Sequence, residues 1–282
     1  MNAISIDLED WWCNEYLLPH LGENLSKYEL NDHLMESVEP VLSLFERTKT
    51  KATFFVLGST AVRYPHLIDR IFDQGHEIAC HGYSHTPLTR LSTLTFEKEL
   101  EQCEEILGKY SLKGFRAPSF SLSNKTKWAI DSLVKYGYEY DSSIFPTWTP
   151  LYGSPKAPRE MYRISSKNVD RIDNTSNFLE VPITVSRTPF FGFPCSGGFW
   201  LRLLPERLLV NQLVKINRVR PVIVYAHPWE ANINSPKTDA GIFANFEANY
   251  SRDSVIHKLE KILNVMKFGR MKDLIDESQV NV

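Results

Sequence analysis

Residues 76–85 read HEIACHGYSH, and this stretch joins a short apolar run directly to two histidines. The run HEIAC has the length and the apolar content of a buried strand. His81 marks its end, and His85 follows after three intervening residues. A polar residue at the end of a buried strand loses hydration unless it has a partner. The question is therefore whether other strands end in the same way.

Strand-like and helix-like segments alternate along the whole chain. Besides 76–80, the predicted strands are 3–7, 51–58, 114–118, 138–143, 178–185 and 221–228. The predicted helices are 33–47, 60–74, 94–107, 124–136, 205–219 and 252–268. Pro40 is expected to kink the first helix or to mark its start. This alternation predicts one α/β domain over residues 1–282 with a parallel sheet, and loop-rich insertions near 144–177 and 229–251.

Polar residues mark the ends of five predicted strands, and these residues are Asp7, His81, Arg116, Asp141 and His227. In a β/α barrel the carboxyl ends of the strands meet on one rim, which carries the active site. Removing five such side chains from water costs free energy unless each of them has a partner. We therefore expect them to pair with each other or to bind a metal.

The HxxxH spacing of His81 and His85 is a weak signal alone, because two turn histidines can have the same spacing. The SIDLED stretch adds Asp7, Glu9 and Asp10 at the end of the first strand. Two imidazoles and one carboxylate bind a divalent metal and leave positions open for water and substrate. Such a centre activates water and polarises a carbonyl, while a carboxylate outside it serves as the base.

Composition argues against several classes of protein. The 282 residues carry a formal net charge of -2, so nothing predicts binding to nucleic acid or to an acidic membrane surface. No apolar run approaches the length of a membrane span. The sequence shows no secretory signal, and its cysteines, at positions 13, 80, 103 and 195, have no paired spacing. We therefore expect free thiols and a cytoplasmic protein, while the oligomeric state stays open.

Five motifs in order, TFFVLG, GHEIACHGYSH, RAPSFS, YDSSIFP and YAHPWE, resemble those of the NodB-homology polysaccharide deacetylases, carbohydrate esterase family four. The resemblance extends from Asp7 to about Glu230. The stretches SIDLED, SGGFWLRLLP and HPWE are most similar to the branch linked to bacterial exopolysaccharide clusters. The resemblance implies a distorted (β/α) barrel, one divalent metal, most often zinc, and hydrolysis of an N-acetyl group on an amino sugar.

The resemblance also implies a metal site. His81 and His85 match the two metal-binding histidines, and Asp7 matches the catalytic base. The family usually has two adjacent aspartates, of which the second binds the metal, so the third ligand here is Glu9 or Asp10. A continuing strand would place Asp7 and Glu9 on one face, and a bend would reverse this. We favour Asp10 as the ligand.

Further roles follow from the same resemblance. Arg116 matches the arginine that positions the base, and His227 matches the general acid that protonates the leaving amine. Asp141 lies in the motif whose aspartate tunes that histidine. Ser119 stands where the family tends to have a tyrosine whose backbone N–H helps to hold the oxyanion, and a backbone donor tolerates this change.

The substrate is expected to be an N-acetylated carbohydrate. Trp12, Trp200 and Trp229 are candidate walls of its binding site, because aromatic faces stack on sugar rings, although core packing explains such residues equally well. A cytoplasmic location favours a lipid-linked or nucleotide-linked precursor over a finished polymer.

Two other functions stay open. The same fold could remove a formyl group or hydrolyse a small cyclic amide. Alternatively, the chain could be an inactive carbohydrate-binding or scaffold protein of an export machine. The presence of the base, both histidines, the arginine and the acid histidine argues against an inactive protein.

Overall fold

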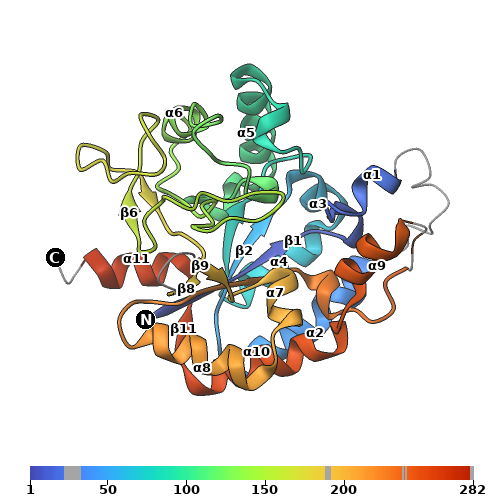
Figure 1. Ribbon diagram of the computed structural model, residues 1–282. Coiled ribbons are helices and arrows are strands. Elements are labelled where there is room, and N and C mark those ends of the chain that lie inside the picture. Colours follow the sequence, from blue (N-terminus) through green and yellow to red (C-terminus); the bar gives the residue numbers. More distant parts are fainter. Residues whose placement is uncertain (22–32, 188–191, 237, 239, 280–282) are drawn as a thin grey trace.

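A curled sheet forms the centre of the molecule in this computed structural model, which describes residues 1–21, 33–187, 192–236, 238 and 240–279 (Figure 1). The strands follow the order β10-β1-β2-β3-β4-β5-β7-β6, and β11 pairs with β1. Their bounds are β1 (Asn2–Leu8), β2 (Thr53–Val56), β3 (Glu77–Cys80), β4 (Gly114–Phe115), β5 (Tyr140–Asp141), β6 (Tyr162–Arg163), β7 (Leu179–Glu180), β10 (Ile223–Ala226) and β11 (Phe268–Gly269). All pairs are parallel except β6 with β7.

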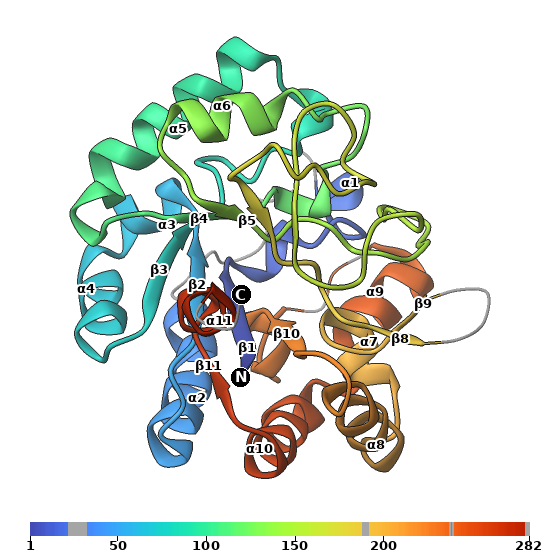
Figure 2. The ribbon, with the colours of Figure 1, turned by 90° about the vertical axis from the view of Figure 1, so that its left-hand side faces the viewer.

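Helices surround the sheet, and in Figure 2 α2, α4, α5, α8 and α10 lie around its outside. The helices are α1 (Leu18–Leu21), α2 (His33–Thr48), α3 (Gly58–Arg63), α4 (Pro65–Asp73), α5 (Thr93–Leu107), α6 (Ala129–Lys135), α7 (Gly198–Leu203), α8 (Glu206–Asn217), α9 (Gly241–Asn249), α10 (Val255–Val265) and α11 (Met271–Gln279). Short 3-10 turns include η1 (Trp11–Cys13), η5 (Pro118–Phe120) and η6 (Pro228–Ala231). No described helix is both long and apolar enough to span a membrane.

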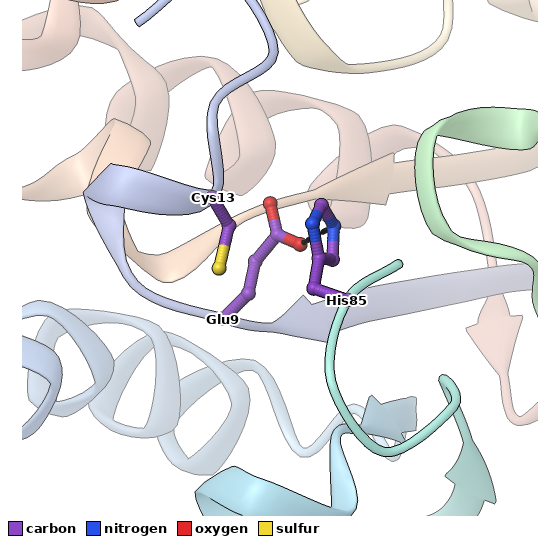
Figure 3. A group of neighbouring side chains, drawn as sticks. All are labelled: Glu9, Cys13 and His85. Carbon is purple, nitrogen blue, oxygen red and sulfur yellow. Dashed lines mark ion pairs between the residues drawn. The ribbon is translucent and has the colours of Figure 1, made fainter. Parts of the chain in front are cut away.

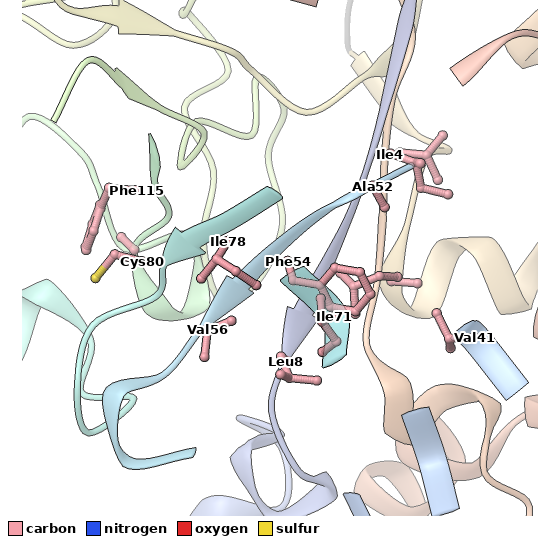
Figure 4. Packing of buried hydrophobic residues seen from close by; sticks show 14 of the residues in the cluster. Ile4, Leu8, Val41, Ala52, Phe54, Val56, Ile71, Ile78, Cys80 and Phe115 are labelled. Carbon is pink, nitrogen blue, oxygen red and sulfur yellow. The ribbon is translucent and has the colours of Figure 1, made fainter. Parts of the chain in front are cut away.

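Two apolar clusters lie on the two faces of the sheet, and a third, smaller cluster includes Trp11 and Trp229. The outer core lies between the sheet and the surrounding helices and includes Leu8, Phe54 and Cys80 (Figure 4). The inner core lies on the opposite face of the same strands and includes Phe55 and Tyr225. Because side chains alternate along a strand, residues next to outer-core positions point into the barrel.

The barrel closes irregularly between β7 and β10. The amide of Thr184 donates to the carbonyl of Ile223 at 3.3 Å, and the amide of Tyr225 donates to the carbonyl of Ser196 at 3.0 Å. A hairpin of β8 (Val185–Arg187) and β9 (Gly192–Pro194) stands beside this closure. The prediction of a distorted (β/α) barrel is confirmed.

Helix α11 covers the amino end of the barrel. The amide of Met271 donates to Oγ1 of Thr53 at 2.8 Å, and the amide of Lys272 donates to Oε2 of Glu77 at 3.2 Å. Thr53 and Glu77 are the first residues of β2 and β3. The polar strand ends therefore lie at the opposite, open rim.

Three predicted elements differ from the structure. The predicted helix 60–74 is two helices that meet at Tyr64, because Pro65 begins the second one. Pro40 lies inside the continuous helix α2. The segment 229–251, predicted as a polar loop, contains η6 and α9. Ala244 and Ala248 of α9 are buried in one cluster with Trp229, which a loop prediction from polarity missed.

Candidate active site

The alternation along β1 selects which acidic residues enter the barrel. Leu8 packs in the outer core, so Asp7 and Glu9 point inward. Asp10 falls on the other face, where its Oδ1 accepts a hydrogen bond from the amide of Trp11 at 2.9 Å and caps η1. The structure therefore places Glu9 with the histidines and corrects the preference for Asp10. The physical reason is that Glu9 stays on the pocket side with Asp7, whereas the side chain of Asp10 is used to cap η1.

Arg116 holds Asp7 in one orientation. Its Nη1 donates to Oδ1 of Asp7 at 2.5 Å and to Oγ of Ser5 at 2.9 Å. Its Nε and Nη2 donate to the carbonyl and the hydroxyl of Ser142, both at 2.9 Å. The guanidinium is fully buried, 4.1 Å from the centre of the Phe55 ring. A buried guanidinium with a hydrogen bond at each of its three nitrogens fixes the carboxylate that it neutralises.

His81 and His85 approach Glu9 from two sides. Nδ1 of His81 lies 2.7 Å from the carbonyl oxygen of Arg116, so this nitrogen carries the proton and donates it. The other nitrogen, Nε2, lies 3.6 Å from Oε2 of Glu9. A turn with positive φ at Gly82 and at His85 itself returns His85 to the site. Its Nε2 lies 2.7 Å from the same oxygen of Glu9.

These residues fit a divalent metal. Oε2 of Glu9 is buried and has no partner in hydrogen-bonding geometry. It faces Nε2 of His81, which is an acceptor because Nδ1 donates, so two acceptors oppose each other. A cation between these two atoms would satisfy both. In metal-binding histidines, the ring nitrogen that is not a ligand typically donates to a backbone carbonyl, as Nδ1 of His81 does to Arg116. Carboxylate and imidazole donors suit zinc and similar ions.

A thiol lies beside this set, which the sequence reasoning missed. One donor atom each from Glu9, Cys13 and His85 lies within 4.8 Å of the other two (Figure 3). The HxxxH and SIDLED patterns carry no signal for this residue, because the turn η1 rather than a strand period brings it to the site.

His227 follows β10 and is held by Glu230. Its Nδ1 lies 2.9 Å from Oε2 of Glu230, and Nε of the buried Arg202 donates to Oε1 of Glu230 at 2.8 Å. Burial opposes the imidazolium, but Glu9, Glu230 and Asp7 raise the pKa of His227 to about 9. Burial also opposes the carboxylate of Glu230, but Arg202 and His227 lower its pKa to about 2. Nε2 of His227 lies 3.5 Å from Oε1 of Glu9 and 3.9 Å from Oδ2 of Asp7.

Asp141 is not the partner of His227. Tyr140 belongs to the inner core, so Asp141 points to the outer face of β5. There its oxygens accept hydrogen bonds from the amide and the hydroxyl of Ser143 at 2.9 and 2.6 Å. Burial raises the pKa of Asp141, and burial together with Asp141 raises that of Glu180, which makes Glu180 the protonated member of the pair. The predicted tuning role of Asp141 is therefore corrected. The carboxylate that lies against His227 is that of Glu230, in the HPWE motif.

A pocket of about 230 Å³ opens over these groups. Its lining includes Asp7, Glu9, Cys13, His81, His85, Ser119, Trp200, Tyr225, His227 and Trp229. Ser119 adopts a left-handed backbone conformation, with a φ of 55°, and its hydroxyl donates to the carboxylate of Glu15. The pocket thus brings Asp7, His227 and the metal-type donors together at the rim that the sequence predicted.

Two of the three predicted tryptophans line this pocket. The ring of Trp229 stacks on that of His227, with 5.3 Å between centroids and 17° between planes. Trp200 contacts the ring of Phe193 edge to face at 5.4 Å. Trp12 is not part of the pocket lining, and the guanidinium of Arg63 lies 5.9 Å from its ring centre. Its predicted place in the substrate site is therefore not supported by the geometry.

Known proteins share this sequence pattern. The family model "Polysaccharide deacetylase" matches residues 30–140, and a domain of unknown function (DUF3473) matches residues 142–276. The peptidoglycan-N-acetylglucosamine deacetylase of Bacillus cereus is 34% identical over 101 residues, which are 34% of this chain and 37% of that protein. The peptidoglycan deacetylase of Helicobacter pylori is 32% identical over 155 residues, which are 53% of this chain and 51% of that protein. The chain thus spans about half the length of these relatives or less.

A solved structure shares the fold. A protein from Mycobacterium smegmatis, described provisionally as a polysaccharide deacetylase, superposes with a TM-score of 0.61 at 18% identity, over 99% of this chain and 90% of that one. The first family match contains His81, His85 and Arg116, and the second contains His227 and Glu230, while one sheet joins strands from both. Over residues 30–140 the chain is therefore similar to the polysaccharide deacetylases, and over nearly its whole length it shares the fold of the Mycobacterium smegmatis protein.

Proposed function

We propose that the chain is a metal-dependent hydrolase that removes N-acetyl groups from an amino sugar, in a polysaccharide or in its lipid-linked or nucleotide-linked precursor. One observation carries this proposal. A single pocket holds the fixed carboxylate of Asp7, the donor set of Glu9, His81 and His85, and the imidazole of His227. Amide hydrolysis needs a base, an electrophilic cation and an acid for the leaving nitrogen, and these groups match that list.

The geometry supports one role in this reaction for each of these groups. A divalent ion held by Glu9, His81 and His85 supplies Lewis acidity toward the acetyl carbonyl and toward water. Asp7 keeps Oδ1 on Arg116 and accepts a proton from water on Oδ2. The water oxygen bonds to the carbonyl carbon, the C–N bond breaks, and Nε2 of His227 gives its proton to the departing nitrogen. Acetate and a free amine are the products.

Glu230 and Arg202 support the acid. The carboxylate of Glu230 accepts from the His227 ring at 2.9 Å and from the His227 amide at 3.0 Å, which fixes the ring. Its charge favours the imidazolium, the only form of His227 that can donate from Nε2 while Nδ1–H stays bonded to Glu230. Arg202 neutralises the second oxygen of Glu230 and keeps that carboxylate ionised.

We further propose zinc as the metal and the cytoplasm as the location. Imidazole, carboxylate and thiol donors around one point support zinc. Four buried cysteines, none of them in a disulfide, support a reducing compartment. The names of the relatives support an N-acetylated glycan as the substrate class. The SIDLED and HPWE stretches support a role in exopolysaccharide synthesis, which favours a precursor as the substrate.

The test is release of acetate by the zinc-loaded protein. Oligomers of N-acetylglucosamine, a nucleotide-linked N-acetyl sugar and a lipid-linked one are offered in parallel, and free acetate and free amine are measured. We expect acetate release that falls by about 10² to 10⁴ in Asp7→Asn. Asp131→Asn is the matched control, since Asp131 is an exposed residue of α6 that does not line the pocket.

Three results would contradict this function. Sugar binding without turnover by the metal-loaded protein would favour a carbohydrate-binding protein. Release of formate from an N-formyl sugar, with no acetate from any N-acetyl substrate, would favour a deformylase. Turnover of a cyclic amide alone would favour the cyclic-amide hydrolase.

A further inference from the structure

Cys13 is the one described cysteine that lines the pocket. Its side chain is buried, with 8% of the residue exposed. The Sγ atom, one donor atom of Glu9 and one of His85 all lie within 4.8 Å of one another (Figure 3). Cys80 precedes His81 in the chain but points into the outer core, and Cys195 is also an outer-core residue. The amide hydrogen bond from Cys13 to the carbonyl of Asp10, 3.0 Å long, holds the turn that sets this position.

A second observation points to a cation at the same place. Glu9 is only 3% exposed, and its Oε2 lacks a hydrogen-bonding partner. This oxygen lies between the Nε2 atoms of His81 and His85, at 3.6 and 2.7 Å. A buried carboxylate oxygen without a hydrogen bond is costly unless a cation compensates it. The thiol of Cys13 therefore stands beside a buried carboxylate oxygen that accepts no hydrogen bond and faces two imidazole nitrogens, as an oxygen that binds a cation would.

We propose that Cys13 is a fourth protein ligand of this metal centre, binding through its thiolate next to Glu9, His81 and His85. The inference rests on the proposed function, since it assigns a further ligand to the same ion. On binding, the S–H bond breaks, a sulfur–metal bond forms, and the proton leaves to solvent. Soft thiolate ligands favour zinc and cobalt over magnesium and manganese.

The local fold explains how a residue four positions after Glu9 returns to the site. Oδ1 of Asp10 accepts the amide of Trp11 at 2.9 Å and starts the single turn η1. The turn ends at Cys13, and Nδ2 of Asn14 donates to Glu247 at 2.9 Å, which ties the next residue to α9. Asp10 thus acts on the site by positioning Cys13 and not by reaching the metal itself.

The test uses cobalt as a spectroscopic probe. Reduced protein is loaded with Co²⁺ alone, and the visible d–d bands report that the ion is bound. Thiolate ligation adds a near-ultraviolet sulfur-to-cobalt charge-transfer band. We expect this band in the wild type and in Cys195→Ser, which removes a buried thiol outside the pocket. We expect its loss in Cys13→Ser and Cys13→Ala while the d–d bands persist.

Zinc affinity provides an independent readout. Mutating a residue that only orients a metal ligand lowers metal affinity by roughly tenfold or more. Loss of a ligand itself, in Cys13→Ala, should therefore lower zinc affinity at least as much. Manganese affinity should change less. Circular dichroism and melting of each variant establish that the fold is intact.

The outcomes separate two failures. One cobalt ion per chain without the charge-transfer band, or a band that survives in Cys13→Ala, overturns the role of Cys13 and leaves the centre of Glu9, His81 and His85 standing. No bound cobalt in the wild type overturns the metal centre, and with it the proposed function and this inference together.

Discussion

Oε2 of Glu230 lies 2.9 Å from Nδ1 of His227 and also accepts the amide of His227 at 3.0 Å. One carboxylate therefore sets both the orientation of the imidazole and the nitrogen that holds its first proton. Glu230 is three residues beyond His227, and the short turn η6 brings the two side chains together. The contact therefore does not depend on the packing of a second strand.

The first prediction concerns the pH dependence of turnover in Glu230→Gln. Glu230 is among the groups that raise the pKa of His227, so the amide variant has a lower His227 pKa. The acid acts as the cation, which exists below its pKa and is lost as pH rises through it. The alkaline limb of kcat should therefore move to lower pH, as measured in a pH–rate profile. Asp141→Asn should leave the limb in place, and the reverse pattern would return the tuning role to Asp141.

The second prediction concerns the buried pair of Asp7 and Arg116. Arg116→Met leaves an unpaired buried carboxylate and should lower the free energy of unfolding by about 3 to 5 kcal/mol. Arg116→Lys keeps the charge but loses the planar fork, so it should retain more stability and still lower kcat by about a hundredfold through misplacement of the base. Urea unfolding and kcat measured together check both statements. Full activity in Arg116→Lys would contradict the positioning role.

The third prediction separates two tryptophans. Trp200 lines the pocket and Trp12 does not. An aromatic contact is worth about 0.5 to 1.5 kcal/mol, so Trp200→Ala should raise KM several-fold with a small change in kcat. Trp12→Ala is the matched control and should leave KM unchanged. Steady-state kinetics on one substrate decide this, and an equal rise in both variants would place the substrate elsewhere.

The fourth prediction concerns stability in acid. The pKa of Glu230 is about 2 in the fold against 4.5 ordinarily, because Arg202 and His227 outweigh burial. A lowered folded pKa contributes stability above about 4.5 that is lost as pH falls toward 2. The difference in unfolding free energy between wild type and Glu230→Gln should therefore shrink by up to about 3 kcal/mol over this window. Urea unfolding at several pH values measures it, and a constant difference would contradict the assignment.

Much of the fold and of the site could be predicted from the sequence. The alternation of strands and helices predicted the parallel barrel, and the polar strand ends predicted the rim at which Asp7, His81 and His227 meet. Both predictions depend on the alternation of side chains between the two faces of a strand and on apolar runs that end in a polar residue. Both patterns can be read directly from a sequence.

The errors have a different physical origin. Asp141 ends a strand of two residues, too short for the sequence to show which face Tyr140 takes. The choice between Glu9 and Asp10 depended on whether the chain bends after β1, which a sequence period does not state. Cys13 and α9 depend on turns and on tertiary contacts at the rim. Local turn geometry and packing, rather than residue type, therefore decided the details of the site.

The most direct test of the metal centre is the metal content of two neighbouring variants, Glu9→Gln and Asp10→Asn. Each changes one carboxylate to its amide, and the protein is loaded with zinc and counted by mass spectrometry. The placement of Glu9 between His81 and His85 predicts about one zinc ion per chain in the wild type and in Asp10→Asn, and loss of zinc in Glu9→Gln. Zinc retained in Glu9→Gln, or lost in Asp10→Asn alone, would contradict the centre described for this protein.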